Sequence, residues 1–344
     1  MKVNLIALSL TLVGSCASLR HTEQIDQLKK NIVFEDTKTM DVYLNTISKE
    51  ELKSHVYNFS SDEFQGRRTG ELGHHKASKF IKDYYIKEKI ASPLGLKYYQ
   101  NVPKSFFSGG IKKSQNVIAY VKGIEFPKEV IIISAHSDHE GYTDTEIYNG
   151  ADDNGSGTAA VMEMAQAFQK AALEGHGPKR SVVFLHLTGE EVGLRGSKYY
   201  TKHPVFSMKN TVANLNIDMI GRIDTAHEHN PNYIYLIGAD RLSTQLHYIS
   251  EAANLQFTNL ELDYRLNSDN DPNRYYFRSD HYNFAQKGVP VIFYFNGEHE
   301  DYHQPTDTPE KINYTLLEKR TKLIFATAWY LANSEKRIIV DQDY

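Results

Sequence analysis

The sequence has only one cysteine and one tryptophan among its 344 residues, and it has no long basic stretch. The single cysteine, Cys16, excludes an intramolecular disulfide bond and a cysteine-based metal cluster, so metal ligands must come from His, Asp or Glu. The lack of a basic stretch argues against nucleic-acid binding. With 40% hydrophobic and 24% charged residues and a net charge of −4, the composition is that of an ordinary globular protein.

The only long apolar run near the N-terminus, Val3–Val13, is too short to span a bilayer. It follows Lys2 and matches the hydrophobic region of a secretory signal peptide. The next tetrapeptide, 13–16 (Val-Gly-Ser-Cys), resembles the lipobox of bacterial lipoproteins, whose cysteine is lipidated. This resemblance predicts a membrane anchor at Cys16 and an extracytoplasmic place in the bacterial cell envelope, on the periplasmic side or at the surface. A plain signal peptide with an incidental cysteine is the alternative.

No repeat, low-complexity tract or Pro/Gly/Ser linker divides the rest of the chain. The polar segment that follows Cys16 suits a tether, with a short helix around Gln24–Lys30. The expected organisation is a signal peptide at 1–15, a lipidated tether at 16–45, one domain at 46–335 and a tail at 336–344.

Short β-branched runs alternate with longer helical patterns, which predicts an α/β fold. Because several strands are apolar at successive positions, we expect a three-layer sandwich with a mostly parallel, mixed central sheet and helices on both faces. The expected strands are 116–122, 130–135, 181–187, 212–217, 233–237 and 291–295. The expected helices are 73–89, 157–172, 243–253, 280–286 and 314–333.

Histidines and acidic residues follow the ends of these expected strands, where open α/β sheets bind ligands. His136, the pair Glu190 and Glu191, and Asp218 each come directly after or soon after an apolar strand. A fourth strand leads into a loop that contains His303. Since a carboxylate that closes a buried strand is costly unless it is paired or bound to a metal, these positions indicate a site.

A glycine-rich loop, 150–157, carries Asp152 and Asp153 into a helix. Glycines let the backbone approach a bound ion closely, although an acidic helix cap would explain the same residues. Together, these segments offer one histidine and one carboxylate to each of two metals, with a further carboxylate to bridge them. Nitrogen and oxygen ligands without sulfur suit two Zn²⁺ ions, with Co²⁺ or Mn²⁺ as substitutes.

Several motifs together resemble one family, the co-catalytic di-zinc aminopeptidases of bacteria, which are relatives of glutamate carboxypeptidase and glutaminyl cyclase. The resemblance covers most of the chain after about Glu50. The segments that carry it are 64–70, 135–138, 151–157, 189–191, 279–281 and 302–303.

The resemblance implies a ligand for each metal position. His136 and Asp218 are expected to bind one zinc, Glu191 and His303 the other, and Asp152 to bridge them. The bond from Asp152 to the supporting residue Asp153 is expected to be cis, as it often is after the family's bridging aspartate.

The resemblance also implies roles around the metals. Glu190 is the expected general base, and Asp138 the partner of the ring of His136. Tyr302 is expected to steady the oxyanion, although a packing role is an alternative for a chain with 23 tyrosines. Asp280 and His281 are expected to shape the substrate pocket, although helix capping also explains Asp280.

The implied activity is hydrolysis of the peptide bond next to a free N-terminus by a metal-bridging hydroxide. A glutaminyl cyclase is a rival on the same fold, but its tryptophan-rich pocket cannot be built with Trp329 alone. A carboxypeptidase or dipeptidase would need a basic pocket for the substrate carboxylate. A non-catalytic surface receptor is the remaining alternative, and such a protein is expected to have lost ligands.

Overall fold

The computed structural model describes residues 22–342, which fall into two compact units, 22–36 and 37–342. The described part of the first unit holds a helix over residues 22–31, where the sequence predicts a short one. The predicted signal peptide and Cys16 lie outside the described residues. Between residues 22 and 342, no helix is long and apolar enough to cross a membrane.

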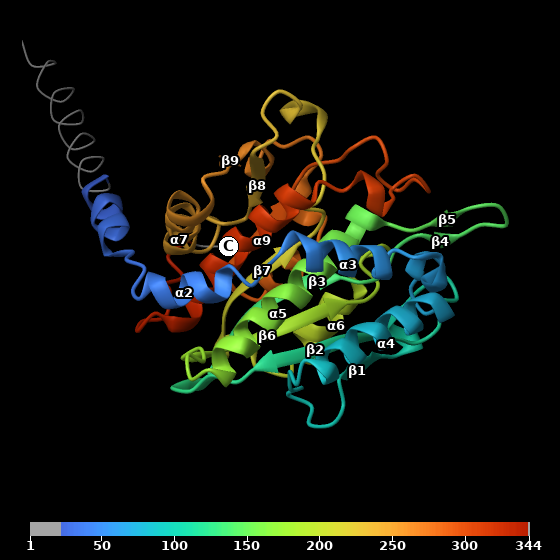
Figure 1. The fold of residues 1–344 in the computed structure, drawn as a ribbon, viewed down its shortest axis with the longest axis horizontal. Helices are drawn as coiled ribbons and strands as arrows, with labels where there is room; N and C mark the ends of the chain where they lie inside the picture. The colour runs from blue at the N-terminus through green and yellow to red at the C-terminus, as the bar shows by residue number, and fades with distance from the viewer. Residues whose placement is uncertain (1–21, 343–344) are drawn as a thin grey trace, which may run out of the picture. The chain divides into compact units, whose positions relative to one another are not determined.

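The second unit is built on an eight-stranded sheet in the order β1-β2-β6-β3-β7-β10-β8-β9 (Figure 1). The central strands β6, β3, β7 and β10 run parallel to one another, while β2 and β8 pair antiparallel to this group. The strands are β1 Tyr99–Val102, β2 Ser114–Val121, β3 Phe126–His136, β6 Arg180–Leu187, β7 Thr211–Ile217, β8 Tyr233–Ile237, β9 Glu261–Asp263 and β10 Val291–Phe295. A separate hairpin joins β4 Gly141–Tyr142 to β5 Ile147–Tyr148.

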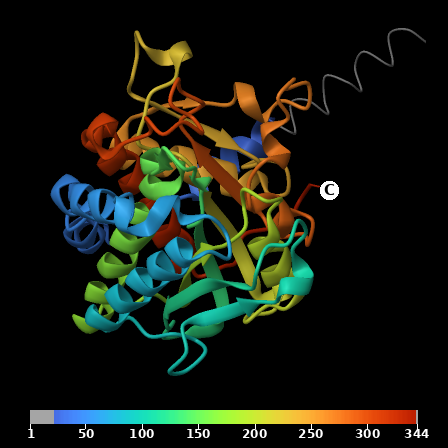
Figure 2. The ribbon, with the colours of Figure 1, turned by 90° about the vertical axis from the view of Figure 1, so that its right-hand side faces the viewer.

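Helices cover both faces of the sheet, as the two ribbon views show (Figures 1 and 2). Helices α5 and α9 pack on one face with α2 and α3 against them, and α6 and α8 pack together on the other. The helices are α2 Thr37–Leu44, α3 Lys49–Phe59, α4 Leu72–Lys87, α5 Gly157–Leu173, α6 Arg195–Lys202, α7 Thr244–Ala253, α8 His281–Ala285 and α9 Tyr314–Asn333. The expected three-layer α/β sandwich is therefore confirmed.

The alternation of side chains along β3 explains why both faces are apolar. Val130 and Ile132 join a core cluster with Tyr200 of α6 and Phe284 of α8. On the opposite face, the ring of Phe168 in α5 packs against the rings of Phe184 in β6 and Phe325 in α9. A strand that is buried on both faces must be apolar at successive positions, as the sequence of β3 is.

All six strands predicted from the sequence are present, with bounds shifted by a few residues. The sequence did not predict β1, β9 and the hairpin, or helices α2, α3 and α6. The compact unit begins at Thr37, before the boundary expected at residue 46, because α2 buries Met40 and Tyr43. Tyr43 stacks on Trp329 of α9 with ring centroids 5.8 Å apart, so α2 belongs to the domain rather than to a tether.

The direction of the four parallel strands determines where the candidate site lies. Because β6, β3, β7 and β10 run in the same direction, their carboxyl ends meet at one edge of the sheet. The residues that follow these strands are therefore close to one another, and the loop that precedes α5 lies at the same edge.

Candidate metal centre

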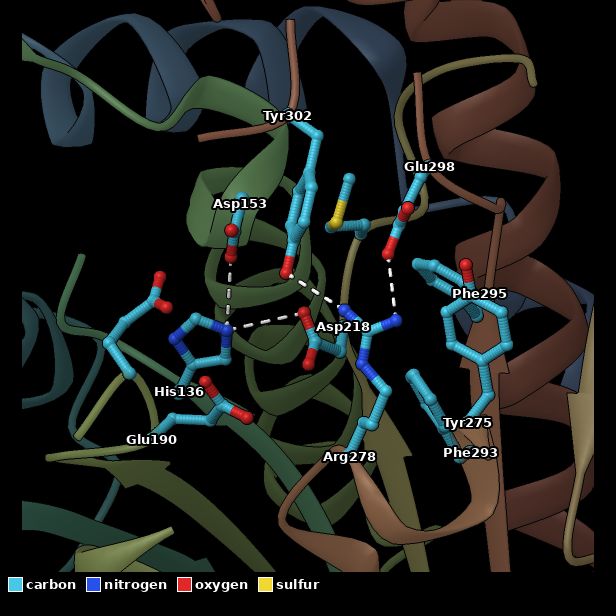
Figure 3. Close-up of a pocket in the computed structure, with 12 residues that line it drawn as sticks. His136, Asp153, Glu190, Asp218, Tyr275, Arg278, Phe293, Phe295, Glu298 and Tyr302 are labelled. Atoms are coloured by element: carbon cyan, nitrogen blue, oxygen red, sulfur yellow. Dashed lines mark hydrogen bonds and ion pairs between the residues drawn. The ribbon is translucent and has the colours of Figure 1, made fainter. Parts of the chain in front are cut away.

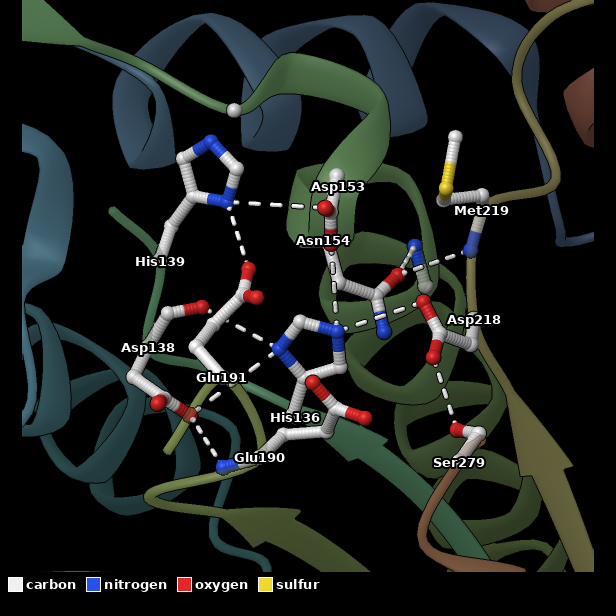
Figure 4. A network of polar contacts seen from close by, with 12 residues as sticks. His136, Asp138, His139, Asp153, Asn154, Glu190, Glu191, Asp218, Met219 and Ser279 are labelled. Carbon is white, nitrogen blue, oxygen red and sulfur yellow. Dashed lines mark hydrogen bonds and ion pairs between the residues drawn. The ribbon is translucent and has the colours of Figure 1, made fainter. Parts of the chain in front are cut away.

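The first cluster of polar side chains surrounds His136, the last residue of β3. Its Nε2 lies 3.2 Å from Oδ1 of Asp218 and 3.2 Å from Oδ1 of Asp153 (Figure 4). Nδ1 of the same ring lies 3.1 Å from the backbone oxygen of Asp138, so the ring is held with Nε2 facing the two carboxylates. Ser279 donates a hydrogen bond to Oδ2 of Asp218 at 2.7 Å. The three side chains thus direct one nitrogen and two oxygens to a common point.

The second cluster shares Asp153 with the first. Nε2 of His303 lies 3.1 Å from Oδ2 of Asp153 and 3.2 Å from Oε2 of Glu191. Asp153 therefore presents one carboxylate oxygen to His136 and the other to His303. Burial lowers the pKa of His303, but the carboxylates of Asp153 and Glu191 raise it overall to about 10. This electrostatic environment favours a cation.

Asp152, which the sequence analysis expected to bridge the metals, does not reach either cluster. Its Oδ1 accepts a hydrogen bond from the backbone N–H of Gly221 at 2.7 Å, and its Oδ2 lies 3.2 Å from Nε2 of His299. Asp153, rather than Asp152, therefore lies between the two clusters. The cis peptide bond is likewise displaced, since it joins Asp153 to Asn154. The side chains of Asp152 and Asp153 point in different directions, and only that of Asp153 faces His136 and His303.

Two residues that the sequence analysis left without a role, His139 and Glu140, also lie at the second cluster. Nδ1 of His139 lies 2.9 Å from Oε1 of Glu191 and 3.6 Å from Oδ2 of Asp153. Oε1 of Glu140 lies 3.5 Å from Nδ1 of His303. Both residues follow β3 in the same loop as Asp138, and this position was the signal that could have found them.

The loop that carries Asp153 is held from two sides by buried charges. The guanidinium of Arg67 donates to the carbonyl oxygens of Asn149 at 2.6 Å and Gly150 at 2.9 Å, and also to Phe59 at 3.1 Å. On the other side, the carboxylate of Asp307 accepts the backbone N–H groups of residues 152 and 153 at distances of 3.0 to 3.2 Å. Both charged side chains are fully buried. The loop backbone is therefore fixed by contacts to its carbonyl groups and to its amides.

The two clusters fit metal ions in their chemistry and spacing. Zinc bonds of 2.0–2.1 Å in a tetrahedron place neighbouring ligand atoms about 3.3 Å apart. The nitrogen-to-oxygen separations of both clusters are 3.1–3.2 Å. Nε2 of His303 is buried and makes no hydrogen bond of good geometry to any described residue. A buried imidazole nitrogen that faces two carboxylates and lacks such a bond is suited to a metal.

A profile of peptidase family M28 matches residues 116–328, which is more than half of the chain and includes every group of both clusters. The chain belongs to peptidase family M28.

Known members of the family and solved structures resemble the M28 chain. It is 27% identical over 236 residues to Aminopeptidase YwaD of Bacillus subtilis, covering 65% of this chain and 46% of that protein. The chain spans about half the length of the curated relatives it matches. BSAP, a zinc aminopeptidase from Bacillus subtilis, superposes with a TM-score of 0.65 at 17% identity, over 86% of this chain and 99% of that one. A Bacteroides thetaiotaomicron glutaminyl cyclase superposes with a TM-score of 0.64 at 15% identity, over 82% and 98%. The fold alone therefore does not distinguish an aminopeptidase from a glutaminyl cyclase.

Glu190 lies beside the two clusters of the M28 chain and is half-buried. Its carboxylate oxygens come close to those of Glu191 and to His136, and its backbone N–H donates to Oδ1 of Asp138 at 3.3 Å. Burial raises the pKa of Glu190 well above its usual range, and the carboxylates of Asp218 and Glu191 add to this, although His136 opposes it. A carboxyl group with a raised pKa can take up a proton near neutral pH.

The expected partner of His136, Asp138, is also fully buried. Its Oδ2 accepts a hydrogen bond from Thr69 at 2.5 Å, and its Oδ1 lies 3.9 Å from Nδ1 of His136. Burial raises the pKa of Asp138 to about 6. The contact to the ring of His136 is therefore made by the backbone oxygen of Asp138 at 3.1 Å rather than by its carboxylate.

A pocket opens beside the clusters (Figure 3). Tyr302 lies on its wall, with its ring stacked on that of His303 at a centroid distance of 3.9 Å. Nη2 of Arg278 lies 3.4 Å from the phenol oxygen of Tyr302. Glu190 and members of both clusters line the pocket, and the other residues that line it are Met219, Tyr275, Arg278, Phe293, Phe295, Glu298 and Tyr302.

Asp280 and His281, which were expected to shape the pocket, do not line it. Asp280 is buried and accepts a hydrogen bond from Ser197 at 2.5 Å. His281 is buried behind Phe293, with ring centroids 4.9 Å apart, and burial lowers its pKa to about 3. Asp280 directly precedes helix α8 and His281 begins it, and of the two His281 packs against a residue of the pocket wall.

Proposed function

We propose that the chain is a zinc-dependent aminopeptidase that hydrolyses the first peptide bond of peptides with a free N-terminus. The observation that carries this proposal is the position of Asp153, whose two oxygens face His136 and His303 on opposite sides. His136 and Asp218 would hold one zinc ion, Glu191 and His303 the other, and Asp153 would contact both. When bound there, the ions would supply an activated hydroxide and polarise the scissile carbonyl group.

The chain's own residues supply proton transfer and orientation. In this proposal Glu190 takes the proton of the attacking water and later passes it to the leaving amine, a role that its raised pKa supports. Arg278 donates to the phenol oxygen of Tyr302, which leaves the phenol proton free to hydrogen bond with the oxyanion of the tetrahedral intermediate.

The pocket argues against the rival activities on this fold. Of the described residues that line it, only Arg278 carries a permanent positive charge, and Glu298 pairs with it at 2.8 Å. The pocket therefore offers no unpaired cation for the carboxylate of a carboxypeptidase substrate. Trp329 of α9 packs between Tyr43 of α2 and Phe168 of α5 and does not line the pocket. It therefore cannot contribute to a cyclase-type pocket.

The experiment that tests the proposal compares aminoacyl-nitroanilides with N-blocked and C-terminal peptide substrates, before and after chelation and zinc restoration. We expect cleavage of the free-amine substrates alone, lost with chelator and recovered with zinc. Glu190→Gln should lower kcat by at least about 100-fold while the zinc content stays the same. Cleavage of C-terminal substrates instead, or near-normal turnover by Glu190→Gln, would contradict the proposal.

We further propose that Cys16 carries a lipid that anchors the peptidase to the bacterial cell envelope. This rests on the lipobox-like sequence 13–16 alone. Cys16→Ser in the full chain should move the protein from the detergent phase to the aqueous phase in a Triton X-114 partition. Partition of the variant into the detergent phase would contradict the anchor.

A further inference from the structure

One ion pair in the pocket belongs to neither metal cluster. Nη1 of Arg278 lies 2.8 Å from Oε1 of Glu298, and the guanidinium lies over the ring of Tyr275, 4.7 Å from its centroid. Arg278 precedes helix α8, whereas Glu298 lies in the loop after β10. Two separate segments of the chain thus place opposite charges side by side in the same pocket (Figure 3).

The rest of the wall away from the metal clusters is apolar or aromatic. Phe293 and Phe295 lie two residues apart on β10, so both face the pocket, and Met219 joins them. The side chains of Arg278 and Glu298 are 39% and 38% exposed. A pair this exposed adds little to the stability of the fold, so a reason for placing two charges beside an apolar surface must be sought in the ligand.

We propose that Arg278 and Glu298 set the charge selectivity of this pocket for the first side chain of the substrate. As a pair they form a neutral wall, which accepts uncharged first residues and disfavours Asp, Glu, Lys and Arg. A charged side chain that enters must compete with one member of the pair for the other. This inference rests on the proposed function, because it assumes that the first side chain of a peptide occupies this pocket.

Removal of the negative charge of Glu298 should therefore shift the preference of the pocket toward a negatively charged first side chain. Glu298→Gln keeps the size of the side chain but leaves the charge of Arg278 uncompensated. Substrates that begin with glutamate or glutamine differ in charge but have nearly the same shape. Comparing the two therefore isolates the electrostatic contribution to the preference of the pocket. The matched control is Glu300→Gln, which removes the same charge from an exposed position of the same loop outside the pocket.

The experiment measures kcat/KM for Glu- and Gln-nitroanilide with the zinc-loaded full chain, and the Kd of the two corresponding α-hydroxamates by calorimetry. In Glu298→Gln we expect kcat/KM for the Glu substrate relative to the Gln substrate to rise by about tenfold or more, and the Kd of the Glu hydroxamate relative to the Gln hydroxamate to fall by a similar factor. Both changes should shrink as salt is added. In Glu300→Gln both ratios should stay within about twofold of the wild-type values.

An unchanged ratio in Glu298→Gln, or an equal change in Glu300→Gln, would overturn the inference. The hydroxamate arm requires no turnover, so it decides the selectivity of the pocket even in a protein that cleaves none of the nitroanilides. Lack of cleavage of every free-amine substrate by the wild type would instead count against the proposed aminopeptidase activity. The two failures are thus distinguishable.

Discussion

The carboxylate of Asp307 accepts the backbone N–H of Asp153 at 3.1 Å, although the two residues are far apart in the sequence. It also accepts the N–H of Asp152, and the backbone oxygen of Asp307 accepts that of Ala151 at 3.1 Å. Three consecutive amides are thus tied to one residue. The direction of the Asp153 side chain, on which both proposed metal sites depend, is fixed by this arrangement.

Asp307→Asn should therefore weaken zinc binding without abolishing the fold. Its amide oxygen can still accept a hydrogen bond, but its NH₂ group would face backbone N–H groups. Mutation of residues that orient metal ligands commonly costs about 10–100-fold in metal affinity, and we expect a loss in this range. Competition with a chelator of known affinity measures it. A zinc Kd equal to that of the wild type would show that the loop needs no support from Asp307.

The carbonyl side of the same loop provides a second test, with a neighbouring residue as the control. Arg67→Lys keeps the charge but cannot reach the separate carbonyl oxygens that the planar guanidinium reaches, so buried acceptors lose their donors. We expect the free energy of unfolding to fall by about 2–4 kcal/mol. Arg68→Lys alters an exposed side chain that donates to the carbonyl of Glu140, and should change stability by less than about 0.5 kcal/mol. Denaturant titration compares them, and equal losses would contradict the special role of Arg67.

The sequence predicted the strand ends well because each one is a buried apolar run that stops at a polar residue. His136, Glu191 and Asp218 could be found in this way. The choice between Asp152 and Asp153 could not, since both are buried carboxylates in one short loop and only the backbone dihedral angles decide which one turns inward. Those angles depend on contacts to distant residues, which the local sequence does not report.

The residues that line the pocket could likewise be predicted only in part from the sequence. The strand that became β10 was predicted, but not which of its faces meets the substrate. Phe293 and Phe295 lie on the same face by the period of the strand, and His281 of α8 stacks on Phe293 without lining the pocket. Short elements such as β1 and α6 were missed because their patterns are brief and much of their stability comes from packing against neighbours.

The two adjacent aspartates offer a direct test of the assignment. Asp153→Asn should lose at least one zinc ion per chain, because a neutral amide replaces the carboxylate that faces both histidines. Asp152→Asn should keep the wild-type zinc content, because its side chain can still accept the hydrogen bond from Gly221 and never faces the metal positions. Metal analysis of both purified variants measures the stoichiometry. Loss of zinc from Asp152→Asn with full zinc in Asp153→Asn would restore the bridging role to Asp152.

The pH dependence of stability tests three buried histidines that belong to neither cluster. Burial lowers the pKa of His74, His186 and His281 from 6.5 to about 3. Between pH 6.5 and 3 the unfolded chain binds protons that the folded chain does not, so stability is fully present above pH 6.5 and is lost as the pH falls. Each of these histidines contributes up to about 1.4 kcal/mol per pH unit to this loss.

Replacement of one of these histidines should reduce the slope of the free energy of unfolding against pH by the contribution of that histidine. Nε2 of His186 lies 2.6 Å from the phenol oxygen of Tyr85, a contact that His186→Gln can keep without a titrating group. The free energy of unfolding, measured by urea titration from pH 6.5 to 4.5, should fall less steeply in this variant by up to about 1.4 kcal/mol per pH unit. The comparison is made with zinc present and after chelation, because metal release also responds to acid. A slope equal to that of the wild type under both conditions would mean that His186 is already protonated in the folded state.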